Sequence, residues 1–99
     1  MFKIVKVSMG GVPKELPAEL QSRGAWPRKV GVVVALGRET FRVEGTYGYK
    51  RGFAKPPTFE FDRLCFDELV EAARKLGATD PAKEVRNLQK KVTDFLAKQ

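Results

Sequence analysis

Aromatic and cationic side chains are interleaved in residues 45–59 (GTYGYKRGFAKPPTF). The interleaved rings and cations are Tyr47, Tyr49 and Phe53 with Lys50, Arg51 and Lys55. A single strand of DNA or RNA binds to such a mixture, because each base stacked on an aromatic ring contributes roughly 1–3 kcal/mol and the phosphates pair with the cations. The chemistry that this stretch predicts is therefore stacking and phosphate contact.

The same rings are also compatible with a place in the core. Alternation along residues 39–49 places Tyr47 and Tyr49 on one strand face with Phe41 and Val43, and for Phe41, Phe59 and Phe61 we favour burial. Trp26 and Phe53 fall in predicted loops beside basic residues, where exposure for binding and burial as an anchor both stay open. Residues 51–54 (RGFA) match the first half of the RNA-recognition-motif octamer, but Lys55 and Pro56 break the match, so that fold is a minor alternative.

Catalysis has little support in the residue types present. The chain has no histidine, which removes the usual proton shuttle, and its one cysteine, Cys65, lies in an apolar stretch without a partner base. Neither Ser8 nor Ser22 stands in the context of a nucleophile elbow. Without histidine or a second cysteine the usual zinc and copper sites cannot be built. We therefore expect a protein that is not an enzyme and that uses no cofactor or metal.

The net charge lies in one part of the chain. The 99 residues contain 19 Lys and Arg against 12 Asp and Glu, a formal charge of +7. Residues 1–57 hold eleven basic and four acidic residues, whereas the rest holds eight of each, which indicates a positive binding side on a neutral scaffold. The composition is 42% hydrophobic and has no apolar run long enough for a membrane span. We expect one folded cytoplasmic module with an anionic partner and no membrane contact.

Four strands are predicted to position these side chains. They cover Phe2–Met9, Arg28–Leu36, Glu39–Tyr49 and Thr58–Asp62, with a tight turn at Gly37-Arg38. The second strand has a core face at Val30, Val32, Val34 and Leu36. Its other face offers Lys29, Gly31, Val33 and Ala35, a flat surface that suits close approach by a ligand or another chain element. Residues 12–24, with two prolines, predict a loop or at most two helical turns.

Two helices are predicted to follow the strands. Asp62 is expected to cap a helix over about residues 63–76, whose wide apolar stripe consists of Leu64, Phe66, Leu69, Val70, Ala73 and Leu76. Asp80-Pro81 begins the second helix, whose apolar side chains follow a coiled-coil spacing: Val85, Leu88, Val92 and Phe95, flanked by Leu96. Since the first stripe can already cover the sheet, we expect this seam to form a homodimer. Folding back onto the protein's own sheet is the alternative.

The order of the predicted elements indicates an α+β fold, with an antiparallel four-stranded sheet followed by two C-terminal helices packed on one face. We expect a basic sheet-and-helix nucleic-acid-binding domain over residues 1–79 and an amphipathic dimerisation helix over residues 80–99.

The layout of residues 42–76 (RVEGTYGYKRGFAKPPTFEFDRLCFDELVEAARKL) resembles that of the positive-cofactor-four type of transcriptional coactivators, which bind single-stranded DNA. Nearly the whole chain, with its C-terminal seam, is similar to the ThermoDBP group of archaeal single-stranded DNA-binding proteins. Both resemblances rest on layout and composition. They imply sequence-independent binding of single strands by a dimer.

The leading hypothesis is a non-enzymatic protein that binds single-stranded nucleic acid largely independently of sequence, with DNA favoured over RNA. We expect the binding side chains to come from the basic part of the chain: Trp26, Arg28, Lys29, Arg38, Arg42, Tyr47, Tyr49, Lys50, Arg51, Phe53 and Lys55. The alternative is a small protein-interaction subunit, in which the aromatic and basic loop forms a contact patch for another protein.

Overall fold

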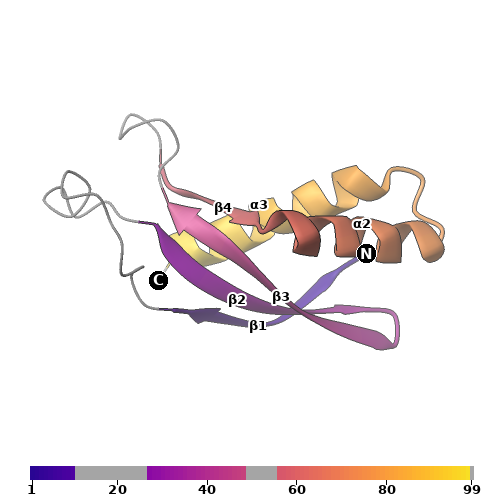
Figure 1. The fold of residues 1–99 in the computed structure, drawn as a ribbon, viewed down its shortest axis with the longest axis horizontal. Coiled ribbons are helices and arrows are strands. Elements are labelled where there is room, and N and C mark those ends of the chain that lie inside the picture. Colours follow the sequence, from indigo (N-terminus) through magenta and orange to yellow (C-terminus); the bar gives the residue numbers. More distant parts are fainter. Residues whose placement is uncertain (11–26, 49–55, 99) are drawn as a thin grey trace, which may run out of the picture.

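The computed structural model of this chain describes residues 1–10, 27–48 and 56–98. One antiparallel sheet has the strand order β1 (Lys3–Met9), β2 (Arg28–Leu36), β3 (Glu39–Gly48) and β4 (Thr58–Phe61). Helices α2 (Arg63–Lys75) and α3 (Pro81–Ala97) follow and lie together on one side of the twisted sheet (Figure 1). The predicted α+β architecture, with four strands and then two helices, is confirmed.

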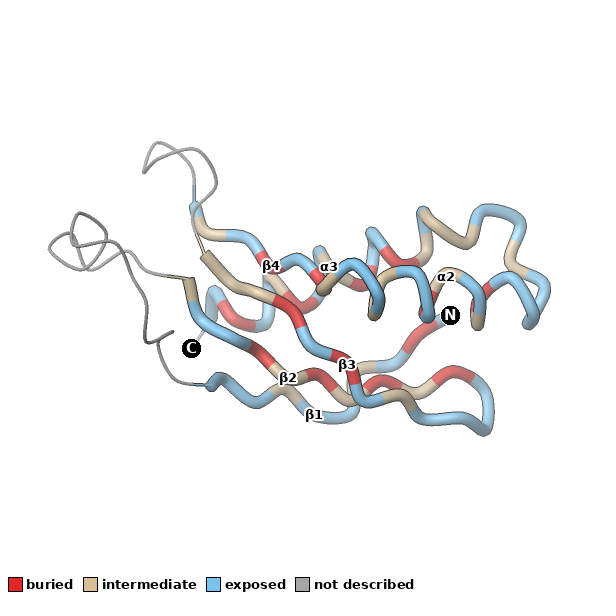
Figure 2. The backbone as a smooth tube through the Cα atoms, viewed as in Figure 1, coloured by how far each residue is buried: buried red, intermediate tan, exposed pale blue. Residues whose placement is uncertain are grey.

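The core lies between the sheet and the helices. Along β2 every second residue is buried, and the four side chains of this buried set, Val30, Val32, Val34 and Leu36, are at most 4% exposed. The same alternation of buried and accessible positions runs along β3 (Figure 2). The rings of Phe59 and Phe61 on β4 complete the layer in an edge-to-face contact, with centroids 4.9 Å apart. One face of the sheet is therefore committed to the core.

Strand β1 contains a β-bulge at Val5. Pairing with β2 shifts register between Ile4 and Lys6, and the Val5 side chain is left 58% exposed. Because the bulge adds one residue, Ile4 and Val7 both pack against the core although they are three positions apart. The bulge consequently turns Lys3, Lys6 and Ser8 toward the opposite face of the sheet.

Helix α2 buries a narrower stripe than the sequence predicts. Only Leu69 and Ala73 of this helix are buried, while Leu64 is 83% exposed and Leu76, just beyond the helix, is 57% exposed. Asp62 occupies the N-cap position, but its side chain makes no capping hydrogen bond, because the carboxylate is turned toward Lys29 instead. The expectation that the first helix covers the sheet by itself is thus wrong.

Helix α3 fills the space that α2 leaves. Its start is as predicted, since the Asp80 carboxylate accepts a hydrogen bond from the Lys83 N–H at 3.2 Å and Pro81 opens the first turn. The seam assigned to a dimer contact is packed into the chain's own core: Val85, Leu88, Val92 and Leu96 are all at most 4% exposed. Phe95 alone of the seam is exposed, at 43%. The chain therefore shields this seam from water by itself, without a second copy.

Side chains of α3 also cover the free edge of β4. The backbone N–H of Phe59 donates to Thr93 Oγ1 and that of Phe61 donates to Gln89 Oε1, each at 2.9 Å. These are the N–H groups that an edge strand would otherwise offer to another strand. The β4 edge is thus closed by its own helix, which ties α3 to the sheet by hydrogen bonds as well as by packing.

Candidate nucleic-acid interface

Within the described residues, the face of the sheet opposite the helices has no element packed on it, and we call it the open face. Its charged residues are Lys3, Lys6, Lys29, Arg42, Glu44 and Glu60. Its centre is made of small side chains from β2, namely Gly31, Val33 and Ala35. The flat second side predicted for β2 is therefore present, with cations on the strands to either side of it.

The cations of the open face differ in their pairing. Lys29 Nζ lies 3.2 Å from the Asp62 carboxylate, in an ion pair whose side chains are 55% and 38% exposed. At such exposure the pair contributes little stability, but it partly neutralises Lys29. Among the described residues, Lys3, Lys6 and Arg42 make no side-chain hydrogen bond or ion pair. These three cations are available to an anion in solution.

A shallow hollow of about 300 Å³ lies in the middle of the open face. Its floor is the backbone of β2 at Gly31 together with the Val33 side chain. Cross-strand pairing places Ser8 and Glu44 on either side of Gly31, and Lys6 and Arg42 on either side of Val33. We call this feature the Gly31 hollow, and it combines an apolar floor with donors and an acceptor at its rim.

The ends of β1 and β3 and the starts of β2 and β4 lie together at one end of the sheet, which we call the loop end. The Gly10 N–H donates to the Lys29 carbonyl at 2.6 Å, so β1 ends beside the start of β2. Pro27 packs so closely on Gly48 that a Cβ there would lie 3.0 Å from its Cα. Gly48 in turn pairs with Thr58 at the start of β4. Residues 11–26 and 49–55 are therefore both attached at the loop end.

The predicted binding residues are distributed over several parts of the molecule. Lys29 and Arg42 lie on the open face, and Arg28 lies at the loop end, exposed and 4.0 Å from the Met9 sulfur. Arg38 lies in the turn at the far end of the β2–β3 hairpin. Since a strand rises about 3.3 Å per residue, the length of β2 places this turn about 30 Å from the loop end. The structure does not bring it together with the others. Outside the described residues lie Trp26, Tyr49, Lys50, Arg51, Phe53 and Lys55.

Tyr47 lies on the covered face of the sheet. It is half-buried, pairs across the sheet with Arg28 and Phe59, and packs against the core. This placement agrees with the alternative reading of the sequence, in which the tyrosine belongs with Phe41 in the core. Its ring is therefore turned away from the open face.

Lys3, Lys6 and Ser8 are open-face residues that the sequence pattern did not single out. Strict alternation along β1 would place Lys3 with Val5 and Val7, and Lys6 with Ile4. The bulge at Val5 breaks this period and turns both lysines to the same side. No single residue of positions 2–9 (FKIVKVSM) indicates a bulge. The placement of Lys3, Lys6 and Ser8 on one face therefore follows only from the pairing of β1 with β2.

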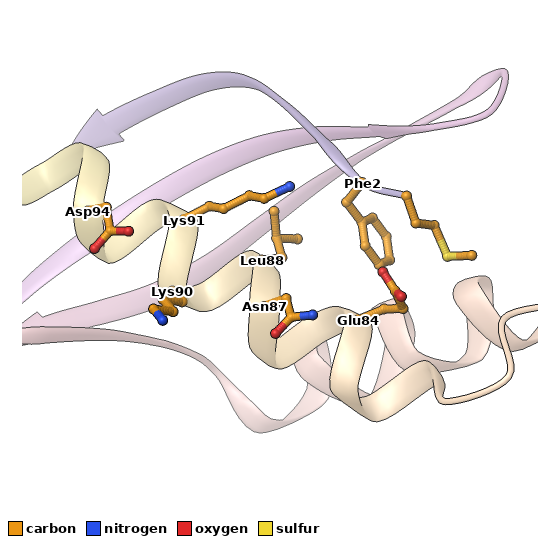
Figure 3. Close-up of a pocket in the computed structure, with 8 residues that line it drawn as sticks. Phe2, Glu84, Asn87, Leu88, Lys90, Lys91 and Asp94 are labelled. Atoms are coloured by element: carbon orange, nitrogen blue, oxygen red, sulfur yellow. The ribbon is translucent and has the colours of Figure 1, made fainter.

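A second hollow, of about 270 Å³, lies between the start of β1 and α3. Phe2 points toward α3 near Leu88 and Glu84, and Lys91 and Asp94 line the hollow farther along the helix (Figure 3). Both signs of charge line this hollow, so it gives no preference for an anionic ligand.

On α2, a hydrogen bond from Arg74 lowers the pKa of the Glu71 carboxyl and raises the pKa of Arg74 itself. That exposed pair lies on the helical side of the molecule.

The described residues contain no cluster of three or more carboxylates or cysteines that could hold a metal ion. In the same part of the chain, neither helix is long and apolar enough to cross a membrane. Comparison with protein-family models, with curated protein sequences and with solved structures found no match to this chain.

Proposed function

We propose that this protein binds single-stranded nucleic acid on the open face and the loop end of its sheet, without catalysing a reaction, and that DNA is favoured over RNA. The observation that carries the proposal is a sheet face that no described element covers, where Lys3, Lys6 and Arg42 have no partner among the described residues and surround a floor of small side chains. A flat floor with cations beside it is complementary to a chain of bases and phosphates.

The distribution of charge supports the same surface. All of the net charge belongs to residues 1–57, which supply β1, β2, β3 and the segments attached at the loop end. The helical side is built from residues with equal numbers of basic and acidic side chains. A phosphate backbone would therefore be drawn to the open face and the loop end rather than to the helices.

Stacking is assigned in this proposal to Trp26, Tyr49 and Phe53. The described part of the open face carries no aromatic side chain, and Tyr47 is turned into the core. Trp26 and Tyr49 directly adjoin Pro27 and Gly48, which are packed together at the loop end. Their rings thus belong to segments that begin beside the cations of β2. The resemblance in sequence layout to the ThermoDBP group and to the coactivators supports single-strand binding.

Pairing of two copies through α3 is not part of the proposal, because its seam is buried within one chain. In the protein-interaction alternative, Tyr47 would contribute only part of its ring to a contact patch, because it is half-buried and packs against the core.

The test is a titration of the whole chain with fluorescently labelled oligonucleotides of one sequence as single-stranded DNA, single-stranded RNA and duplex DNA, each at several salt concentrations. We expect the single strands to bind more tightly than the duplex, and the affinity to fall steeply with rising salt as counterions are released. Equal affinity for single strand and duplex would contradict the proposal. A salt-insensitive complex, or no complex at all, would favour the protein-interaction alternative.

A further inference from the structure

Gly31 occupies the middle of β2, where a glycine weakens a sheet. It lacks a side chain to pack and loses more conformational freedom on folding than alanine does. A Cβ at this position would meet only the Ser8 carbonyl oxygen, at 3.9 Å, which is an ordinary contact. The backbone there does not have the positive φ that favours glycine. Alanine would therefore fit, and the fold gives no reason for the glycine.

The other glycines that the structure describes each have a structural reason. A Cβ on Gly45 would lie 2.2 Å from a backbone oxygen of β4, and one on Gly48 would lie 3.0 Å from the backbone of Pro27. A third, on Gly10, would lie 3.1 Å from the Lys29 oxygen. Two more glycines have positive φ: Gly37 and Gly77. Among the described glycines, Gly31 thus stands apart, and it forms the floor of the Gly31 hollow.

The rim of the hollow is polar and unpaired. Within the described residues, neither the Glu44 carboxylate nor the Ser8 hydroxyl makes a side-chain hydrogen bond or ion pair, and both flank Gly31 in the cross-strand row. In the adjacent row, Lys6 and Arg42 flank Val33. The hollow therefore offers a two-oxygen acceptor on one side and N–H and O–H donors around it.

We infer that the Gly31 hollow is a base subsite that receives one guanine of the bound strand. This inference rests on the proposed function and names the base that the open face selects. The ring lies on the peptide plane at Gly31, which a side chain would obstruct. Glu44 accepts hydrogen bonds from the base, and Lys6, Ser8 and Arg42 donate to its acceptors or to the adjoining phosphates.

Guanine matches this rim better than the other bases do. Its Watson–Crick edge carries N1–H and the N2 amino group side by side, and these two donors can reach the two oxygens of one carboxylate. Adenine and cytosine present a single amino group beside an acceptor nitrogen, and thymine and uracil have no amino group. A phosphate in the hollow would be repelled by Glu44. The Glu44 carboxylate thus favours a base over a phosphate, and it favours guanine over the other bases.

The first test fills the floor of the hollow. Gly31→Ala and Gly31→Val are compared with Ala82→Val, which enlarges a side chain in α3, away from the open face. The probe is a thymidine strand of about 15 nucleotides, within the range of one single-strand-binding module, with a single central guanine. We expect Gly31→Val to weaken binding about tenfold, with Gly31→Ala intermediate and Ala82→Val unchanged. Thermal unfolding should show that neither Gly31 variant is less stable than the wild type.

The second test changes the acceptor and the donor separately. In the probe strand the central guanine is replaced by inosine, which lacks only the N2 amino group, or by thymine. We expect the wild type to bind the guanine strand about tenfold more tightly than the thymine strand, with inosine between them. In Glu44→Gln this ratio should fall close to one. The ratio is the readout because removal of a negative charge raises affinity for every strand alike.

The results separate this inference from the proposed function. If the wild type binds all three strands equally, or if Gly31→Val binds the guanine strand as the wild type does, the base subsite is refuted while single-strand binding stands. A guanine preference that persists in Glu44→Gln also overturns the inference. Failure of the wild type to bind any of the strands overturns the inference and the proposed function together.

Discussion

At the scale of single residues, two neighbouring glycines of the sheet have opposite requirements. A Cβ on Gly45 would lie within 2.6 Å of the Phe59 ring and 2.2 Å from the Glu60 carbonyl oxygen, whereas one on Gly31 would meet nothing closer than 3.9 Å. We expect Gly45→Ala to destabilise the protein by about 1–3 kcal/mol, because neither the strand nor the buried ring can move aside cheaply.

Gly31→Ala serves as the control for Gly45→Ala. It should leave stability unchanged or raise it by about 0.5–1 kcal/mol, the ordinary difference between these residues in a strand. Urea unfolding of both variants measures the difference. Equal stabilities would mean that the close approach of β4 to β3 at Gly45 is wrong.

Residue types in the sequence indicate the chemistry, but the partners of each residue depend on the fold. Alternation along β2 separates Lys29 and Gly31 from Val30 and Val32 correctly. The spacing of Asp62 before a helix predicts a cap, yet the cross-sheet neighbour Lys29 takes its carboxylate. That competition involves residues far apart in the chain and has no local signal.

At the scale of elements, α3 is joined to the sheet through the edge of β4. We expect Thr93→Val to cost about 1–3 kcal/mol, because it leaves the Phe59 N–H without its acceptor in a partly buried place. Thr93→Ser retains the hydroxyl and should keep most of the stability. Chemical denaturation gives the energies, and amide exchange at Phe59 gives the local effect. If the valine and serine variants unfold alike and protect that amide equally, α3 does not cover this edge.

Removal of α3 tests whether residues 1–79 form a domain by themselves. The truncation takes away the four core side chains Val85, Leu88, Val92 and Leu96. Each buried aliphatic contributes about 1.5–3 kcal/mol, so together they approach the roughly 5–15 kcal/mol that stabilises a typical domain. We expect a chain ending at Thr79 to show no cooperative unfolding transition.

The full chain with the exposed Phe95 changed to serine is the matched control for this truncation, and it should keep its transition. A truncated chain that unfolds cooperatively would instead support a separate domain over residues 1–79.

The elements themselves are readable from the sequence, and their packing less so. The five helices and strands described from residue 28 onward all start where the sequence predicts, at Arg28, Glu39, Thr58, Arg63 and Pro81, because alternation, turns and helix breakers are local signals. Which helix covers the sheet is decided by competition for one apolar face. Helix α3 buries four aliphatic side chains against the sheet and the other helix, whereas α2 buries only Leu69 and Ala73.

At the scale of the whole molecule, one face of the sheet forms the core with the helices and the other is the open face. The helices shield one face, and the charge asymmetry of the chain follows the same division. The sequence predicts this bipolar charge, but the bulge in β1 that brings Lys6 beside the Gly31 hollow appears only in the pairing register. The open face is therefore the surface on which we expect the nucleic acid to bind.

The most direct test compares charge removal from the two faces. Lys6→Ala combined with Arg42→Ala removes two cations from the open face, and Arg86→Ala combined with Lys90→Ala removes two exposed cations from α3. Fluorescence anisotropy with one single-stranded oligonucleotide over a range of salt concentrations measures both, after thermal unfolding has shown that each variant is folded. We predict that the open-face variant loses affinity and that its salt slope falls by up to about one unit per cation, while the α3 variant binds as the wild type does. Equal losses in both variants, or a loss in the α3 variant alone, would contradict binding on the open face.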